Sequence, residues 1–154
     1  SSDLAGNGSI VNACLSVGFD VSAIEMNESH LPKLRELQSS GVVAGRRCDI
    51  HLSDFLLTPV PGPLALFDAV AMNPPFTGLA DIAHVTHALK FVKPGGILVA
   101  ITSPSWTFRQ DKRCKAFIEL IKSQRTYGSV QLSPGTFSSS GTQVSTVMLT
   151  VVKA

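Results

Sequence analysis

The sequence predicts an α/β fold with a mostly parallel sheet that ends in an antiparallel hairpin. Over residues 1–124, short apolar runs typical of strands alternate with segments of helical periodicity. Two further β patterns, at 129–132 and 144–152, are joined by a segment rich in serine and glycine that is too short for a crossover helix. Strands connected in this way pair most easily in the antiparallel sense.

The first half of the chain alternates helices and strands. The elements expected there are, in order, a glycine-containing turn at 3–9, a helix at 10–17, a strand at 19–26, a helix at 29–39 and a strand within 42–50. Ser29 is expected to cap the second helix, because a serine oxygen can accept a hydrogen bond from a free N–H of the first turn. Gly18 and Gly41 are expected to end the two helices.

The second half begins after a loop marked by Pro59, Pro61, Gly62 and Pro63. The elements expected there are a strand at 67–72, a helix at 79–91, a turn at 93–96, a strand at 97–102, a helix at 111–124 and the terminal hairpin. No internal repeat or linker interrupts this order. With 154 residues and 44% hydrophobic content, the chain is expected to form one domain, residues 1–154, around one core.

Composition narrows the possible classes of protein. Cys14, Cys48 and Cys114 are widely spaced and odd in number, so buried or half-buried thiols are expected rather than a disulfide framework or a zinc ribbon. His84 and His87 share a helix but lack further ligands, so no metal site is expected. The net charge of +2 identifies no polyanionic partner. Without a membrane-length apolar stretch or signal-peptide pattern, a cytoplasmic protein is expected.

The segment Asn73-Pro74-Pro75-Phe76 carries the functional interpretation. It directly follows the apolar strand pattern at 67–72, read as a buried strand, and two prolines can neither continue a helix nor donate ladder hydrogen bonds. Proline favours an extended conformation in the residue before it, which would present the Asn73 carboxamide at a fixed angle. Ligands of open α/β sheets bind at the carboxyl ends of strands. A rigid turn after a strand is the alternative interpretation.

This tetrapeptide resembles the catalytic motif of amino-group methyltransferases that use S-adenosylmethionine, which include DNA adenine-N6, RNA and protein-glutamine N5 enzymes. The resemblance implies a Rossmann-like class I methyltransferase sheet and S-adenosyl-L-methionine as cofactor. It also implies that Asn73, Pro74, Pro75 and Phe76 are catalytic. The Asn73 carboxamide oxygen and the Pro74 carbonyl oxygen would accept hydrogen bonds from the NH₂ group, and Phe76 would stack on the planar acceptor.

The glycines of Ala5-Gly6-Asn7-Gly8 permit a backbone turn and a close approach to a ligand at a helix N-terminus. The segment can be a simple turn or part of a dinucleotide fingerprint, but Val11 stands where that fingerprint has its third glycine, which counts against NAD or FAD. It resembles the methionine-binding loop of S-adenosylmethionine enzymes. Asp3 lies one residue nearer the glycines than the usual acidic residue of that loop.

Two further positions match the cofactor-binding pattern of these enzymes. Glu25 ends a strand where an acidic residue accepts hydrogen bonds from both ribose hydroxyls, and Met26 would lie against the adenine. Asp54 would accept a bond from the exocyclic amine, with Phe55 against the ring. Met26 can equally be a core residue, and Asp54 a helix cap. The cofactor-binding residues implied by the resemblance are Asp3, Ala5, Gly6, Gly8, Glu25, Met26, Asp54, Phe55 and Asn73.

The acceptor is expected to be adenine N6 in DNA. Phe76 favours a nucleobase amine, because the corresponding motif of the protein-glutamine enzymes is similar to Asn-Pro-Pro-Tyr, with tyrosine in place of Phe76. Residues 132–137 and 140–144 look like the hairpin region of phage and bacterial adenine-type DNA methylases, where Phe137 would reach the target, unless they form only a hairpin tip. Trp106 and Arg109, followed by further basic residues, can stack on bases and bind phosphates, or can simply begin a helix with a solvated face.

Three alternatives stay open: a protein-glutamine N5 enzyme, an RNA enzyme, and a catalytically silent subunit that binds cofactor or a partner. The fold also needs an apolar strand before the glycine turn, central in the sheet, and only two residues precede Asp3. Without that strand its two neighbours would share no partner. The domain is therefore expected to be incomplete at its N-terminus, and a further segment or chain is expected to help recognise the target.

Overall fold

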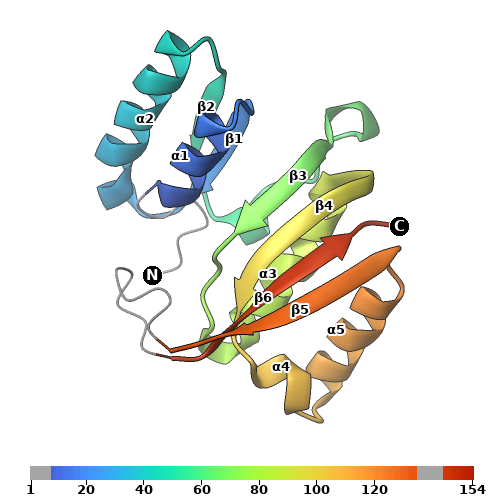
Figure 1. The fold of residues 1–154 in the computed structure, drawn as a ribbon. Coiled ribbons are helices and arrows are strands. Elements are labelled where there is room, and N and C mark those ends of the chain that lie inside the picture. The colour runs from blue at the N-terminus through green and yellow to red at the C-terminus, as the bar shows by residue number, and fades with distance from the viewer. Residues whose placement is uncertain (1–7, 135–143) are drawn as a thin grey trace. The chain divides into compact units, whose positions relative to one another are not determined.

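The computed structural model describes residues 8–134 and 144–154. Its contacts group the chain into two compact units, with the boundary between Pro59 and Val60 (Figure 1). Strand order likewise divides the sheet, because β1 and β2 form one sheet and the other four strands form a second. Each unit is described in turn.

The first unit is a small α/β layer. Its elements are α1 (Ser9–Ser16), β1 (Val21–Glu25), the 3₁₀ turn η1 (Glu28–His30), α2 (Leu31–Val43), β2 (Cys48–Leu52) and the 3₁₀ turn η2 (Phe55–Leu57). The two strands run parallel, from the pair Val21 and Cys48 to the pair Glu25 and Leu52. A compact core joins helices to strands. Its buried members are Val11, Ala23, Leu34, Leu37 and Cys48.

The expectation that Gly41 ends the second helix is wrong, because α2 continues to Val43. Gly41 is instead a packing position, where an added Cβ would lie 3.2 Å from a methyl group of Leu15 on α1. The chain turns at Gly45, which has a φ of 74°, and the Arg46 N–H donates to the Gly41 carbonyl at 2.8 Å. A left-handed glycine after the last turn is a common way to end a helix.

The second unit contains a four-stranded sheet in the order β3-β4-β6-β5. Its elements are η3 (Pro63–Ala65), β3 (Phe67–Met72), η4 (Thr77–Leu79), α3 (Ala80–Ala88), η5 (Leu89–Phe91), β4 (Val92–Thr102), α4 (Ser105–Phe108), α5 (Lys112–Lys122), β5 (Thr126–Leu132) and β6 (Thr146–Val152). β3 and β4 are parallel, whereas β6 is antiparallel to both β4 and β5. The predicted α/β fold with a terminal antiparallel hairpin is confirmed.

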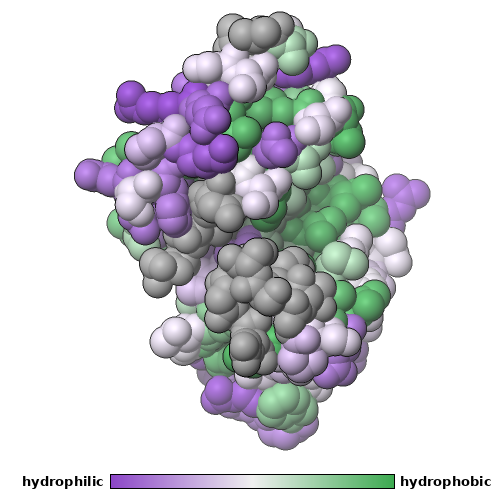
Figure 2. Space-filling model, turned by 60° about the vertical axis from the view of Figure 1, so that its left-hand side comes forward, coloured by the Kyte–Doolittle hydropathy of each residue, from purple (hydrophilic) through white to green (hydrophobic). Residues whose placement is uncertain are grey.

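Helix α3 packs against β4 and α5, and α5 also contacts β5. The core of this unit includes fully buried side chains from the two central strands, among them Leu98 of β4 and Leu149 of β6. Hydrophobic side chains also reach the surface, and the face drawn in Figure 2 shows them beside hydrophilic ones. In the described ranges, no helix has the length and apolar character that a membrane span needs.

Two expectations about the strands need correction. β3 was expected to be buried, but it lies at the edge of its sheet and only Met72 is buried. The turn at 93–96 was expected to precede a separate strand, yet β4 runs through it from Val92 to Thr102. The Gly95 N–H donates to Lys153, and the Lys153 N–H donates to Gly96, each at 2.9 Å. These bonds continue the pairing with the end of the chain, so the turn is an irregularity within one strand.

Candidate functional site

The Asn73–Phe76 loop begins at the carboxyl end of β3, where the sequence predicts it. Pro74 is buried, and the side chains of Asn73, Pro75 and Phe76 are half-buried. None of the four belongs to a helix or strand, and η4 follows at Thr77. β3 is parallel to β4, so the loop lies at the edge of the sheet where ligands of α/β proteins bind.

An uncommon backbone conformation follows the loop. Gly78 and Leu79 are both left-handed, with φ of 64° and 62°. Among the residues that the structure describes, Leu79 is the only non-glycine with a positive φ. For a leucine this conformation costs about 1–2 kcal/mol. The Leu79 N–H donates to the Phe76 carbonyl at 3.3 Å, so the turn is bonded directly to the loop.

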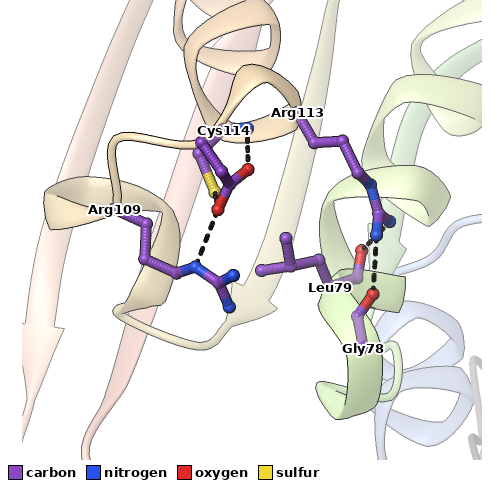
Figure 3. A network of polar contacts seen from close by, with 6 residues as sticks. Gly78, Leu79, Arg109, Arg113 and Cys114 are labelled. Carbon is purple, nitrogen blue, oxygen red and sulfur yellow. Dashed lines mark hydrogen bonds and ion pairs between the residues drawn. The ribbon is translucent and has the colours of Figure 1, made fainter.

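Arg113 of α5 holds this turn from the side (Figure 3). Its Nη1 donates to the Gly78 carbonyl at 3.1 Å, and its Nη2 donates to the Leu79 carbonyl at 3.4 Å. The rigid guanidinium fork therefore contacts two consecutive carbonyl groups. Arg113 is one of the basic residues after Arg109 for which the sequence predicts either phosphate binding or a solvated helix face. No sequence signal indicates this contact with two carbonyl groups.

The start of α5, which carries Arg113, is fixed by Asp111. One carboxylate oxygen accepts from the Cys114 N–H at 3.1 Å, and the other accepts from Arg109 Nε at 2.8 Å. The hydrogen bond from the Cys114 N–H lowers the pKa of Asp111 most; burial opposes this effect, and the charge of Arg109 lowers the pKa further. Burial, and next the charge of Asp111, raise the pKa of the Cys114 thiol. Arg109 therefore has a structural partner beside the phosphate-binding role expected of it.

A second group of hydrogen bonds connects the start of α3 to the end of β4. Asp81 is fully buried, and its carboxylate accepts from the N–H groups of Ile82 at 3.0 Å and of Ser103 at 2.8 Å. Ser103 directly follows β4. The helix after the Asn73–Phe76 loop is thus fixed to the segment after the neighbouring strand. Sequence reasoning missed this residue, because an aspartate in the first turn of a helix ordinarily indicates only a favourable helix dipole.

Trp106, predicted to bind substrate, is 6% exposed. Its indole N–H donates to Thr102 Oγ1 at 2.9 Å, and its ring meets Phe117 edge to face with centroids 5.3 Å apart. The structure favours a packing role over substrate binding for Trp106. The exposed aromatic residue of this segment is Phe108, at 65%. Phe137 lies outside the described residues.

Of the predicted glycine loop, the structure describes Gly8, whereas Asp3, Ala5 and Gly6 lie outside the described residues. Gly8 precedes α1 and has a φ of 86°, as a glycine turn at a helix start requires. A Cβ at this position would overlap the Leu37 side chain. The position of Gly8 therefore admits only glycine without rearrangement.

Glu25 and Asp54 lie at the same edge of the first unit. Glu25 is the last residue of β1, and its carbonyl accepts from the Ser53 N–H at 2.9 Å. Its carboxylate is 1% exposed; one oxygen accepts from the Asn27 N–H at 2.7 Å and the other lies 3.5 Å from His30 Nδ1. The predicted position at a strand end is confirmed, and the ribose contact stays a prediction.

The neighbouring cofactor candidates divide between solvent and core. Met26 is 51% exposed, which rules out the core interpretation of its side chain. The Asp54 side chain accepts a hydrogen bond from the Leu56 N–H at 2.9 Å and so caps η2. The structure therefore shows the helix cap that was the alternative to adenine binding. Phe55 is buried. Contact of Met26, Asp54 and Phe55 with an adenine stays a prediction.

His84, His87 and the three cysteines make local packing and hydrogen-bond contacts. His84 Nδ1 is 2.7 Å from the Ala80 carbonyl oxygen, and His87 meets Phe91 edge to face. All three cysteines are free, and burial raises the pKa of Cys14 and of Cys48, the latter also through the charge of Asp49. Within the described ranges, no three residues of the metal-binding types come together as a site.

Neither a protein-family model nor a curated protein sequence matches the chain. Solved structures do. A type I restriction-modification methyltransferase subunit from Streptococcus thermophilus is 18% identical, with a TM-score of 0.77, over 98% of this chain and 38% of that one. An rRNA methylase from the same organism is 16% identical, with a TM-score of 0.59, over 97% of this chain and 82% of that one.

A Listeria monocytogenes protein proposed to be a class I S-adenosylmethionine-dependent methyltransferase is 17% identical, with a TM-score of 0.71, over 98% of this chain and 52% of that one. The fold is that of the class I methyltransferases. This chain thus spans about half or less of two of these three proteins and most of the third. The predicted Rossmann-like class I methyltransferase fold is confirmed.

Proposed function

We propose that this chain is an S-adenosylmethionine-dependent methyltransferase that acts on a conjugated exocyclic NH₂ nitrogen, with adenine N6 of DNA as the acceptor. The observation that carries the proposal is the position of Asn73-Pro74-Pro75-Phe76 at the carboxyl end of a parallel strand in a class I methyltransferase fold. The loop is fixed at both ends, by β3 before it and by the left-handed turn after it.

The described residues of the first unit fit the proposed cofactor. Gly8 has a left-handed φ of 86° directly before α1, a conformation that favours glycine, as expected of a glycine turn at the start of a cofactor-binding helix. The Glu25 carboxylate stands at a strand end; its oxygens contact Asn27 and His30, so ribose hydroxyls would have to share or replace these contacts. Met26 offers an exposed thioether side chain. In this assignment the Asp54 carboxylate still accepts the hydrogen bond from the Leu56 N–H that caps η2. It also accepts a hydrogen bond from the exocyclic amine of the adenine.

When bound, the cofactor supplies an electrophilic methyl group on a sulfonium. The thioether that leaves needs no acid. The chain must therefore aim and activate a nitrogen whose lone pair is delocalised. In the proposed mechanism, the Asn73 carboxamide oxygen and the Pro74 carbonyl oxygen accept hydrogen bonds from the NH₂ group and stabilise its developing positive charge. With the cofactor bound, the nitrogen lone pair would take the methyl group, the thioether would leave with the electrons of the carbon–sulfur bond, and the nitrogen would then lose a proton to solvent.

Phe76 and the neighbouring proteins favour a nucleic-acid acceptor. The half-buried Phe76 ring can stack on a planar base, and base stacking on aromatic side chains is sequence-tolerant. The similar structures include a restriction-modification methyltransferase subunit and an rRNA methylase, which supports a nucleic-acid acceptor. A base within duplex DNA would have to be flipped out to reach the catalytic loop.

Asn73→Ala tests the mechanism. The variant should bind the cofactor with unchanged affinity, because Asn73 acts mainly on the acceptor, and should lose about 10²-fold or more in the rate of methyl transfer. Binding is measured by calorimetry and transfer by counting label from methyl-labelled cofactor. Thr77→Ala, an exposed position next to the loop, is the control and should retain the wild-type rate. A wild-type rate of methyl transfer by Asn73→Ala would contradict the proposed mechanism.

The acceptor is tested by offering labelled cofactor together with DNA, RNA or a cell protein extract. Label recovered as N6-methyladenine in DNA supports the proposal. Label in RNA or in glutamine residues of protein replaces adenine N6 of DNA with one of the alternative acceptors. Cofactor binding without transfer to any acceptor indicates the catalytically silent subunit, and overturns the proposed activity.

A further inference from the structure

Arg113 meets the catalytic segment at a point where the backbone needs external support. Leu79 carries a left-handed conformation that a branched side chain disfavours, and its side chain is buried. Such a conformation persists only when its surroundings determine it. The two hydrogen bonds from Arg113 act on the carbonyl groups of this residue and of Gly78, the two positions with positive φ.

The support comes from a different element of the same unit. Arg113 lies in the first turn of α5, 34 residues beyond Leu79 in the chain. That turn is fixed by the Asp111 cap and by the fully buried Cys114 next to Arg113. Arg113 itself is exposed at the surface apart from these contacts. Its guanidinium is therefore carried by a helix start whose first turn is capped and packed.

A short chain of bonds leads from Arg113 to the loop. The Leu79 N–H donates to the Phe76 carbonyl, so fixing the peptide groups on either side of Leu79 also fixes Phe76. We propose that Arg113 is a positioning residue for methyl transfer, which acts on Phe76 through the Gly78–Leu79 turn. This inference rests on the proposed function, because it assigns Arg113 a part in the use of the same loop.

Three variants test the inference. Arg113→Ala removes both hydrogen bonds, and Arg113→Lys keeps the charge but cannot hold two carbonyl groups as a planar fork. Lys122→Ala removes one positive charge from the other end of the same helix and is the matched control. Arg113→Ala should lower kcat about tenfold or more, since small misplacements of a reacting group are costly. Arg113→Lys should recover part of the loss, and Lys122→Ala should behave as wild type.

The split between kinetic constants separates positioning from contact with the acceptor. Cofactor affinity should be unchanged in Arg113→Ala, and the loss should fall on kcat rather than on KM. A loss confined to KM would indicate a phosphate contact of Arg113 and would overturn the inference. An unchanged kcat would overturn it as well.

Hydrogen exchange supplies a readout that does not depend on activity. Peptides that contain residues 76–80 should exchange faster in Arg113→Ala than in wild type, whereas peptides from β4 and β6 should not change. Equal exchange at 76–80 would show that Arg113 does not hold the turn. If the wild-type chain transfers no methyl group, the proposed function and the catalytic part of this inference both fail, and the exchange measurement still decides the structural part.

Discussion

Asp81 is a carboxylate without contact with solvent, and its two bonds to N–H groups give it a structural purpose. A buried charge is tolerated only when its oxygens are satisfied, and hydrogen bonds to an ionised group are stronger than neutral ones. The bond to Ser103 spans 22 residues and joins two segments that flank the carboxyl end of the parallel pair β3 and β4. Asp81 therefore stabilises the segments around the Asn73–Phe76 loop.

Asp81→Ala should lower the free energy of unfolding by about 1–3 kcal/mol, because the Ser103 N–H would be left buried without an acceptor. The measurement is urea unfolding followed by circular dichroism. Asp68→Ala is the control, since its carboxylate is exposed and pairs with Lys93 at 2.9 Å. An exposed ion pair contributes about 1 kcal/mol or less. Equal losses in the two variants would contradict a special role for Asp81.

At the scale of elements, the ionised carboxylate of Asp111 stabilises the first turn of α5. Asp111 caps the helix in its ionised form, and its pKa is lowered chiefly by the bond from the Cys114 N–H. A carboxylate with a lowered folded-state pKa contributes stability above its unfolded-state pKa. That contribution is lost as the pH falls through the lowered value. Protonation of Asp111 would loosen the turn that carries Arg113.

Acid should therefore destabilise the wild-type chain more than Asp111→Asn, whose side-chain oxygen can still cap the helix but does not titrate. The comparison is the midpoint of thermal unfolding of each protein between neutral and acidic pH. The two curves should converge as the pH falls below the folded-state pKa of Asp111. Parallel curves over the whole range would show that Asp111 contributes nothing to the acid sensitivity.

The elements also show what a sequence can predict. Apolar runs and their periodicity in the local sequence located β1, β3, α3 and the terminal hairpin, although β3 and β5 are largely exposed in the structure. The end of α2 and the course of β4 depend on distant partners, namely Leu15 against Gly41 and Lys153 against Gly95 and Gly96. Likewise the position of Asn73 was predictable as a motif, but the partner of Arg113 was not, since it lies on another element.

At the scale of the whole molecule, the described strands form two separate parts, a two-stranded sheet and a four-stranded sheet. β1 and β3, for which the sequence analysis expects a shared neighbour, belong to different parts. Within the four-stranded part, β4 and β6 each pair on both sides, whereas β3 and β5 are edges. Two-stranded sheets are marginally stable by themselves and rely on the helices packed against them.

Amide hydrogen exchange should therefore be slowest in β4 and β6 and faster in β1 and β2, after correction for intrinsic rates. The physical reason is that central strands open only with the largest cooperative unit, while a small sheet can open alone. The experiment is exchange of the wild-type chain followed by mass spectrometry of peptides from all six strands. Equal protection of β1 and β4 would indicate that the two parts open together.

Gly96 sets a rule for recognising relatives of this chain. A Cβ at Gly96 would lie 2.8 Å from the Asp68 carbonyl oxygen and 2.7 Å from a Val92 methyl group. A chain with any other residue at this position must place β3 and β4 farther apart there, or begin their pairing later. A glycine here is therefore a mark of shape, independent of the chemistry that the neighbouring loop performs, and it can guide alignments in which overall identity is low.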